Sequence, residues 1–131
     1  MKGRKPPHRL DSNPLTEVLP APEWMSSDAK AEWERVMPAL IQRRILTEAD
    51  LGGVENYCQA IASARQCDRE LQNRGHVYED EKGNLKRNPA SIAHKDALNS
   101  ARLLAAELGL TPVSRSRPAV SPPADEDDLL D

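Results

Sequence analysis

Apolar residues recur at intervals of three and four between residues 29 and 41, which predicts one face of an α-helix. The residues on this face are Ala29, Trp33, Val36, Met37, Leu40 and Ile41. Ser26 or Ser27 can cap the start of the helix. Pro38 lies inside the stripe and is expected to bend the helix, which should end near residues 43–44.

A second, longer helix is predicted from Thr47 to Arg74. Its first four residues, Thr-Glu-Ala-Asp, resemble a capping box with Asp in the last position, and Gly75 can end the helix. Only residues 45–46 join it to the first helix, so the two are expected to form an antiparallel helical hairpin. The pair Gly52–Gly53 predicts a close crossing of the first helix over the start of the second.

A small β-hairpin and a third helix follow. Residues 76–79 and 85–87 flank a polar turn that contains glycine, which is typical of a short hairpin that leans on a helix or on a neighbouring subunit. Asn88 and Pro89 then provide a cap and a first position for a helix that ends at Gly109. The apolar stripe of this helix is alanine-rich: Ala90, Ala93, Ala97, Ala101, Leu104 and Leu108.

These elements predict a mainly α fold: an antiparallel helical hairpin plus a third helix, with the β-hairpin between the second and third helices. We expect three segments: a flexible basic, Pro-rich arm over residues 1–25, a helical domain over 26–117 and a disordered acidic tail over 118–131. The chain has 131 residues, 3 % aromatic residues and no Phe, so its core should be thin. Small helical chains with thin cores often associate with copies of themselves.

Charge is unevenly distributed along the chain. The net charge is −3, but residues 118–131 alone carry −5 and the remainder carries +2. The cations that are candidates for contact with DNA phosphates form three clusters: Lys2, Arg4, Lys5 and Arg9 in the arm, Arg43 and Arg44 between two helices, and Arg115 and Arg117 in an extended segment after Pro112.

Each of these clusters also has a simpler interpretation. The arm can be a terminus that only increases solubility. The 43–44 pair can complement the end of a helix, which we favour for that pair. The cations at 115 and 117 can form salt bridges to a neighbouring subunit. The sequence alone leaves these alternatives open.

No motif of an enzyme is present, and we expect neither catalytic residues nor a cofactor. The sequence contains no Gly-rich phosphate loop, no His-Glu-x-x-His, no Gly-x-Ser-x-Gly and no Cys-x-x-Cys. The acidic run 125–128 is expected to be a solvated tail rather than a metal site. Cys58 and Cys67 lie too far apart on one helix to form a disulfide, which fits a reducing compartment. No apolar run is long enough to span a membrane, so a cytoplasmic protein without a membrane partner is expected.

The order of several short motifs resembles the small terminase subunits of tailed bacteriophages. These motifs are Ala29-x-x-Glu32-Trp33-x-Arg35, Leu46-Thr47-x-x-Asp50, Tyr57-Cys58, Gly75, Asn88-Pro89 and Gly109-Leu110-Thr111-Pro112-x-Ser114-Arg115-x-Arg117. The resemblance extends over residues 20–117, and the opening Lys2-Gly3-Arg4-Lys5-Pro6 is similar as well. Val113 departs from the pattern, because the family commonly has a small polar residue there.

The resemblance implies a non-enzymatic, virus-encoded packaging subunit that acts in the host cytoplasm and is not expected in the virion. Such subunits form rings of identical copies and bind the packaging-start site on concatemeric double-stranded viral DNA. They pass that DNA to the large terminase subunit, which carries the ATPase and nuclease, and they regulate both activities.

Two further questions stay open at this stage. The end of the chain, with Asp127, Asp128, Leu129 and Leu130, is either a docking peptide for the large subunit or an inert tail. The rival function is a phage-encoded dimeric transcriptional regulator, which would share the basic arms and the helices. A small metal-dependent nuclease is a third class, against which the missing motifs argue.

Overall fold

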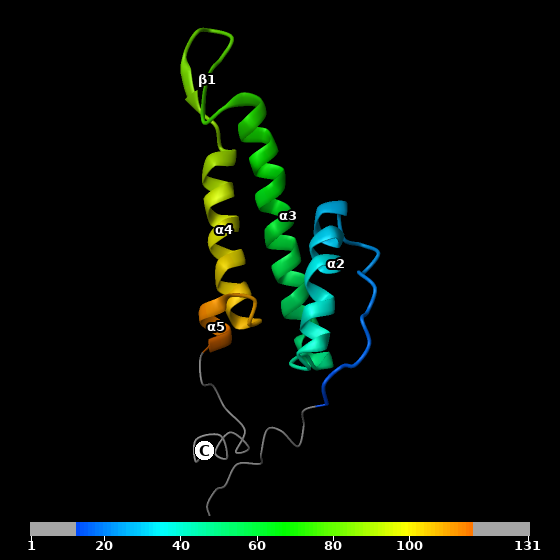
Figure 1. The fold of residues 1–131 in the computed structure, drawn as a ribbon. Helices are drawn as coiled ribbons and strands as arrows, with labels where there is room; N and C mark the ends of the chain where they lie inside the picture. Colours follow the sequence, from blue (N-terminus) through cyan, green and yellow to red (C-terminus); the bar gives the residue numbers. More distant parts are fainter. Residues whose placement is uncertain (1–12, 117–131) are drawn as a thin grey trace, which may run out of the picture.

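Helices dominate the structure, a computed structural model that describes residues 13–116 (Figure 1). The elements are α2 (Ser27–Gln42), a 3₁₀ turn η1 (Glu48–Asp50), α3 (Leu51–Arg74), β1 (Val77–Glu79), β2 (Leu85–Arg87), α4 (Ala90–Glu107) and α5 (Pro112–Ser116). The predicted fold class is confirmed: three long helices carry a two-stranded antiparallel sheet between the second and the third. Residues 1–12 and 117–131 lie outside the described part of the chain.

Helix α2 begins and ends where the sequence predicts. The Ser26 hydroxyl oxygen accepts a hydrogen bond from the Ala29 N–H at 3.3 Å and thereby caps the first turn. Pro38 lies inside the helix, and Arg43 follows its last residue. Arg44 then adopts a φ of 57°, in the left-handed region, and this reverses the chain direction toward α3.

The start of α3 combines a confirmed prediction with a wrong one. Thr47 and Asp50 form the predicted capping box, in which the Asp50 carboxylate accepts the Thr47 N–H at 2.8 Å. The two glycines, however, do not admit a crossing of α2. A Cβ on Gly52 would meet nothing within 4 Å, and one on Gly53 would meet the Leu108 side chain at 4.0 Å. The element near Gly53 is therefore the end of α4.

The core lies at the end of the molecule where α2, the first half of α3 and the last turns of α4 converge. Helix α3 lies between the other two and runs antiparallel to both (Figure 1). The fully buried large side chains are Met37, Leu40, Val54 and Cys58. Toward the hairpin, α3 buries only Ala64 and Leu71 in its second half. This distribution agrees with the predicted thin core.

Residues 13–25 run along the outer side of α2 without regular secondary structure. The Trp33 indole N–H donates to the Leu19 carbonyl at 2.8 Å, and the Leu15 N–H donates to the Leu46 carbonyl at 2.8 Å. Met25 is buried, whereas Trp24 is 59 % exposed. The arm predicted for residues 1–25 therefore includes a packed section, and its basic cluster precedes the described residues.

The β-hairpin contacts the last residue of α3, which is one of the two supports that the sequence left open. Tyr78 lies opposite Lys86 in the register, and the Arg74 guanidinium lies 4.0 Å from the centre of the Tyr78 ring. The Asn88 side chain joins the hairpin to both helices, because its Nδ2 donates to the Gly75 carbonyl at 2.9 Å and its Oδ1 accepts the Ala90 N–H at 3.0 Å. The predicted cap of the third helix is thereby confirmed.

The prediction of an extended segment after Pro112 is wrong, because residues 112–116 form helix α5. Gly109 ends α4 with a φ of 72°, and Pro112 then begins a new helix instead of only stopping the old one. Thr111 Oγ1 accepts the Ser114 N–H at 3.1 Å, and Ser114 Oγ accepts the Thr111 N–H at 3.2 Å. This reciprocal cap satisfies the N–H groups of Thr111 and Ser114, and proline is favoured at the first helical position.

Candidate nucleic-acid interface

Four segments that are distant in sequence meet at one end of the molecule. The corner between α2 and α3 lies beside the first described residues, because Leu15 bonds Leu46. The same corner contacts the end of α4, because the Arg43 Nη1 donates to the Gly109 carbonyl at 2.8 Å. Helix α5 follows directly, so both ends of the described chain lie at this end of the fold (Figure 1).

The contact between Arg43 and Gly109 bears on whether the basic pair at the corner complements a helix end or is free to contact DNA. The Arg43 side chain complements a carbonyl beyond the end of α4, and not the end of its own helix. Arg44 is exposed, and its side chain has no hydrogen-bond or ion-pair partner within residues 13–116. Arg43 therefore has a structural role, while Arg44 is available to a ligand.

Arg115 extends this cationic end. It lies on α5, is exposed and has no ion-pair partner in the described range. The fold thus brings Arg43, Arg44 and Arg115 to one end of the molecule. Five of the predicted DNA-binding residues lie outside the described residues: Lys2, Arg4, Lys5, Arg9 and Arg117.

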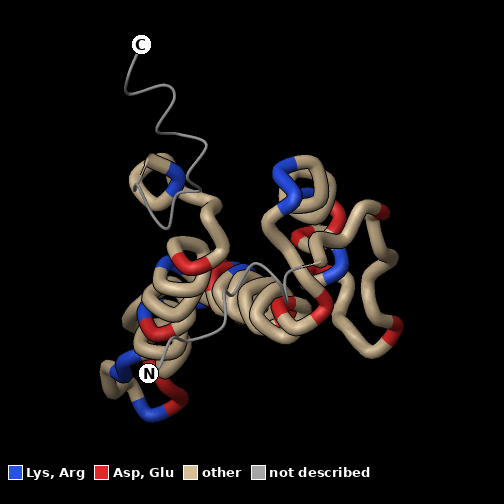
Figure 2. The backbone as a smooth tube through the Cα atoms, turned by 90° about the horizontal axis from the view of Figure 1, so that it is seen from below, with Lys and Arg blue, Asp and Glu red and all other residues tan. Residues whose placement is uncertain are grey.

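Acidic residues moderate the charge of this end. Glu48 is exposed in η1, and Glu107 is exposed in the last turn of α4. Figure 2, viewed from this end, shows basic and acidic positions interspersed along the long helices. A net positive field at this end therefore depends on the cations of residues 1–12 and on Arg117.

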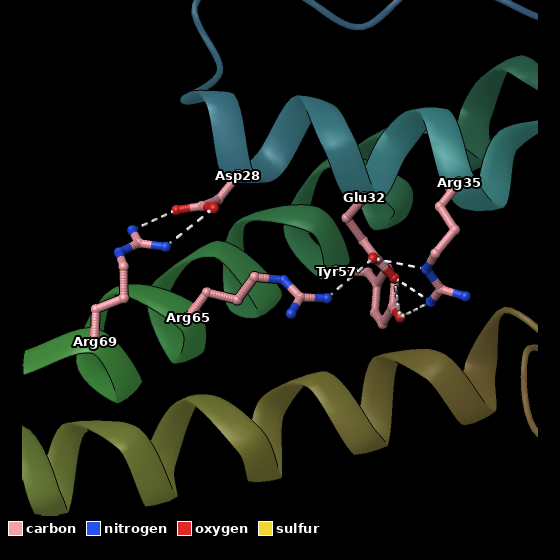
Figure 3. Close-up of polar contacts among 6 residues, drawn as sticks. All are labelled: Asp28, Glu32, Arg35, Tyr57, Arg65 and Arg69. Atoms are coloured by element: carbon pink, nitrogen blue, oxygen red, sulfur yellow. Dashed lines mark hydrogen bonds and ion pairs between the residues drawn. The ribbon is translucent and has the colours of Figure 1, made fainter. Parts of the chain in front are cut away.

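A buried carboxylate forms the most developed polar cluster among the described residues, and the sequence pattern did not predict its role. The Glu32 side chain is 1 % exposed, although it lies on α2 among apolar neighbours. It accepts a hydrogen bond from Arg35 Nε at 2.9 Å and one from the Tyr57 hydroxyl at 2.6 Å, and Arg65 lies 3.8 Å away (Figure 3). Tyr57 and Arg65 come from α3, so the cluster joins the two helices.

The electrostatics of this cluster favour an ionised Glu32. Burial alone would raise the pKa of Glu32, but hydrogen bonds from Arg35 and Tyr57 and the charges of Arg35 and Arg65 outweigh it and lower the pKa. Burial, together with the neighbouring Glu32 carboxylate, raises the pKa of Tyr57 to about 12. Tyr57 therefore stays a proton donor and Glu32 stays an acceptor across the physiological range.

A second ion pair joins the same helices one turn farther on. The Arg69 guanidinium donates to the Asp28 carboxylate at 2.6 Å (Figure 3), and its hydrogen bond holds the pKa of Asp28 below the usual value. For the Glu32 cluster, the only signal in the sequence was the position of Glu32, one turn after the buried Ala29 on the apolar face of α2. Its partners on α3 have no local pattern, so the pairing itself was not predictable.

The sequence as a whole matches one family. Residues 29–125 match the profile of the phage terminase small subunit family, and this range includes nearly all of α2 and the whole of α3, α4 and α5. The chain belongs to this family. No match was found among curated proteins or among solved structures.

Membership in the small-subunit family supports a role in phage DNA packaging. Small terminase subunits are generally non-catalytic regulators of packaging. The match begins after the basic cluster at residues 2–9 and ends before the acidic and leucine residues at 127–130. The family match therefore gives no information on the role of these two segments.

Two properties of residues 13–116 bear on other functions of this small subunit. No group of three or more His, Cys, Asp or Glu side chains in that range lies close enough together to hold a metal ion. In the same residues, no helix is both long and apolar enough to cross a membrane.

Proposed function

We propose that this small subunit binds the packaging-start site of concatemeric viral DNA as an oligomeric ring in the host cytoplasm. It recruits the large terminase subunit and regulates the ATPase and nuclease of that subunit. Family membership supports the packaging role, and the placement of the cations supports the contact with DNA.

The observation that carries the DNA-binding proposal is the convergence of basic residues at one end of the fold. Arg44 and Arg115 are exposed there, and their side chains have no ion-pair partner in the described range. The chain enters the described range beside Leu46 and leaves it after α5, so residues 2–9 and Arg117 are tethered to the same end. A duplex at this end would meet up to seven cations in addition to Arg43, and phosphate contacts of this kind supply most non-specific affinity.

Self-association is supported by the distribution of burial. The second half of α3 and the first half of α4 bury few side chains, and several large apolar side chains are about half exposed or more. Such surfaces are stabilised when a neighbouring copy covers them. A ring also repeats the cationic end around its circumference, which multiplies weak phosphate contacts.

Replacing Arg44, Arg115 and Arg117 by alanine tests the placement of the DNA site. We expect weaker retention of duplex DNA in gel-shift assays at low salt, with unchanged circular dichroism. The control replaces Lys82 and Lys86 in the hairpin, at the opposite end of α3. An equal loss of affinity in both variants would place the DNA elsewhere.

For the large subunit, we propose that Asp127, Asp128, Leu129 and Leu130 form the docking peptide. The carboxylates would steer the encounter, and the two leucines would anchor it. Deleting residues 124–131 should abolish stimulation of the large subunit's ATPase and leave DNA binding intact. Full stimulation by the shortened chain would show that the tail has no such role.

The rival function, a dimeric transcriptional regulator, makes a different prediction for the assembly. Light scattering of the purified chain distinguishes the two functions, because a regulator of that kind would give a dimer. A closed ring supports the packaging function.

A further inference from the structure

The two sides of the helical layer differ in what covers them. Beyond α2 lies the packed segment 13–25, whereas α4 and the hairpin lie on the opposite side of α3 with no further layer in the described part of the chain (Figure 1). In a ring, each subunit contacts its two neighbours through two different surfaces, which must complement one another. These two sides are therefore the surfaces to compare.

The outer side of α4 carries apolar side chains that face away from the core. Ile92 is 53 % exposed and Leu103 is 56 % exposed. Ile92 lies nine residues before the buried Ala101, which places the two on opposite faces of the helix. Leu103 lies two residues after Ala101 and shares the outer face with Ile92.

The hairpin continues this surface. Tyr78 and Lys86 face α3, because Tyr78 contacts Arg74. Side chains alternate along a strand, so Val77 and Leu85 lie on the face opposite to Tyr78. They are 59 % and 72 % exposed. We call the outward surface formed by Val77, Leu85, Ile92 and Leu103 the α4 edge.

The opposite side of the molecule offers a hollow instead of projecting side chains. A hollow of about 470 Å³ lies between the segment 13–25 and α2. Its lining includes Val18, Pro20, Lys30 and Glu34. We call this surface the N-terminal edge. Val18 is 55 % exposed there, so the hollow presents apolar surface to a partner.

The two edges differ in charge. Around the α4 edge, the cations Arg87, Lys95 and Arg102 are matched in number by Glu79, Asp96 and Glu107. Around the N-terminal edge, Glu17 and Glu34 exceed Lys30 by one, so this edge is acidic and the cations of the α4 edge can pair with it. None of these nine side chains forms an ion pair with another residue between 13 and 116.

We propose that the α4 edge of one copy packs against the N-terminal edge of the next copy, with Ile92 and Leu103 directed toward the hollow beside Val18. This inference rests on the proposed ring and names its subunit contact. The contact is heterologous, because two different surfaces meet, and repetition of such a contact closes into a ring when the rotation between copies allows it.

Two variants of the full chain test the contact, each altering one edge. The first carries Ile92→Lys and Leu103→Lys, and the second carries Val18→Lys and Glu34→Lys. All four positions are exposed in the single chain, so circular dichroism should match that of the native protein. Each variant alone should have the mass of a single chain in native mass spectrometry, because lysines disrupt one of the two surfaces.

Mixing the two variants gives the decisive result. In the mixture, the first variant supplies an intact N-terminal edge and the second supplies an intact α4 edge. One-to-one complexes should therefore form and grow no further. The matched control, Leu98→Lys, places the same charge on another face of α4 and should retain the native mass. Leu98 is 47 % exposed and lies beside Ile61, toward α3.

The possible failures are distinguishable. A native protein that is monomeric with and without DNA would overturn the proposed ring itself. A native ring that survives both sets of substitutions would overturn only the edge contact. Loss of assembly in the α4 variant alone, with no pairing in the mixture, would show that α4 pairs with α4 and would also overturn it.

Discussion

Glu32 decides how α2 attaches to α3, because its buried carboxylate is held by residues of both helices. Tyr57 donates to it from α3, and Arg35 donates from α2 itself. Each arginine in the cluster remains more than half exposed, so the cations retain much of their hydration while the anion does not. An anion in this position is stable only while its partners remain.

Replacing Glu32 by glutamine should lower the free energy of unfolding by about 1–3 kcal/mol, the cost of weakening charged hydrogen bonds at a buried site. Chemical denaturation monitored by circular dichroism measures this change. Glu81→Gln is the control, because Glu81 is exposed in the hairpin turn. An equal effect of both substitutions would contradict a special role for Glu32.

The same cluster predicts a dependence of stability on pH. The pKa of Glu32 in the folded state is lower than the ordinary value of 4.5. Its contribution is therefore fully present above about pH 4.5 and is lost as the pH falls through the lower, folded-state pKa. The difference in unfolding free energy between native protein and Glu32→Gln should shrink below pH 4.5. A difference that stays constant down to pH 2 would contradict the assignment.

At the scale of elements, chain reversals depend on a few residues with special conformations. Gly109 ends α4 with a positive φ, and its carbonyl accepts the Arg43 side chain. The N–H of Leu110 returns to the Ala105 carbonyl at 2.8 Å, which closes the end of the helix. This reversal positions α5, and therefore Arg115, relative to the α2–α3 corner.

Gly109→Ala should destabilise the protein by about 1–2 kcal/mol, because an L side chain is strained at that φ. Gly52→Ala is the opposite control: its Cβ would meet nothing within 4 Å, and alanine in a helix should stabilise by up to about 1 kcal/mol. Urea denaturation of the two variants should therefore give shifts of opposite sign. A loss of stability in Gly52→Ala would show that this glycine has a role that the fold does not explain.

Element bounds were largely predictable because the signals are local. Ser26, Thr47 with Asp50, Gly75 and Asn88 all mark helix ends through bonds to residues at most four positions away. Helix α5 was missed for a local reason: Pro112 was interpreted as a stop, although Thr111 and Ser114 form a cap around it.

Other features depend on contacts between distant segments, which the sequence pattern does not encode. The neighbour of Gly53 is Leu108, more than fifty residues away. The partners of Glu32 on α3 and the bond from Arg43 to Gly109 are similarly remote. For the candidate site, the sequence identified the cations, but only the fold showed that Arg43, Arg44 and Arg115 share one end.

On the scale of the whole molecule, the described residues carry slightly more acidic than basic side chains, so we expect the proposed DNA binding to depend on the basic cluster at the start of the chain. Replacing Lys2, Arg4, Lys5 and Arg9 by glutamine should reduce the slope of log affinity against log salt by about 3 to 4. Fluorescence anisotropy at several salt concentrations measures this slope. An unchanged slope would show that these four cations do not contact phosphates.

The central claim is that copies of this chain assemble into a ring that binds viral DNA. Native mass spectrometry of the full-length protein, with and without duplex DNA from the ends of the viral genome, tests it most directly. We expect one closed oligomer that gains the mass of the duplex. A monomer in both samples, with no bound DNA at low salt, would contradict it.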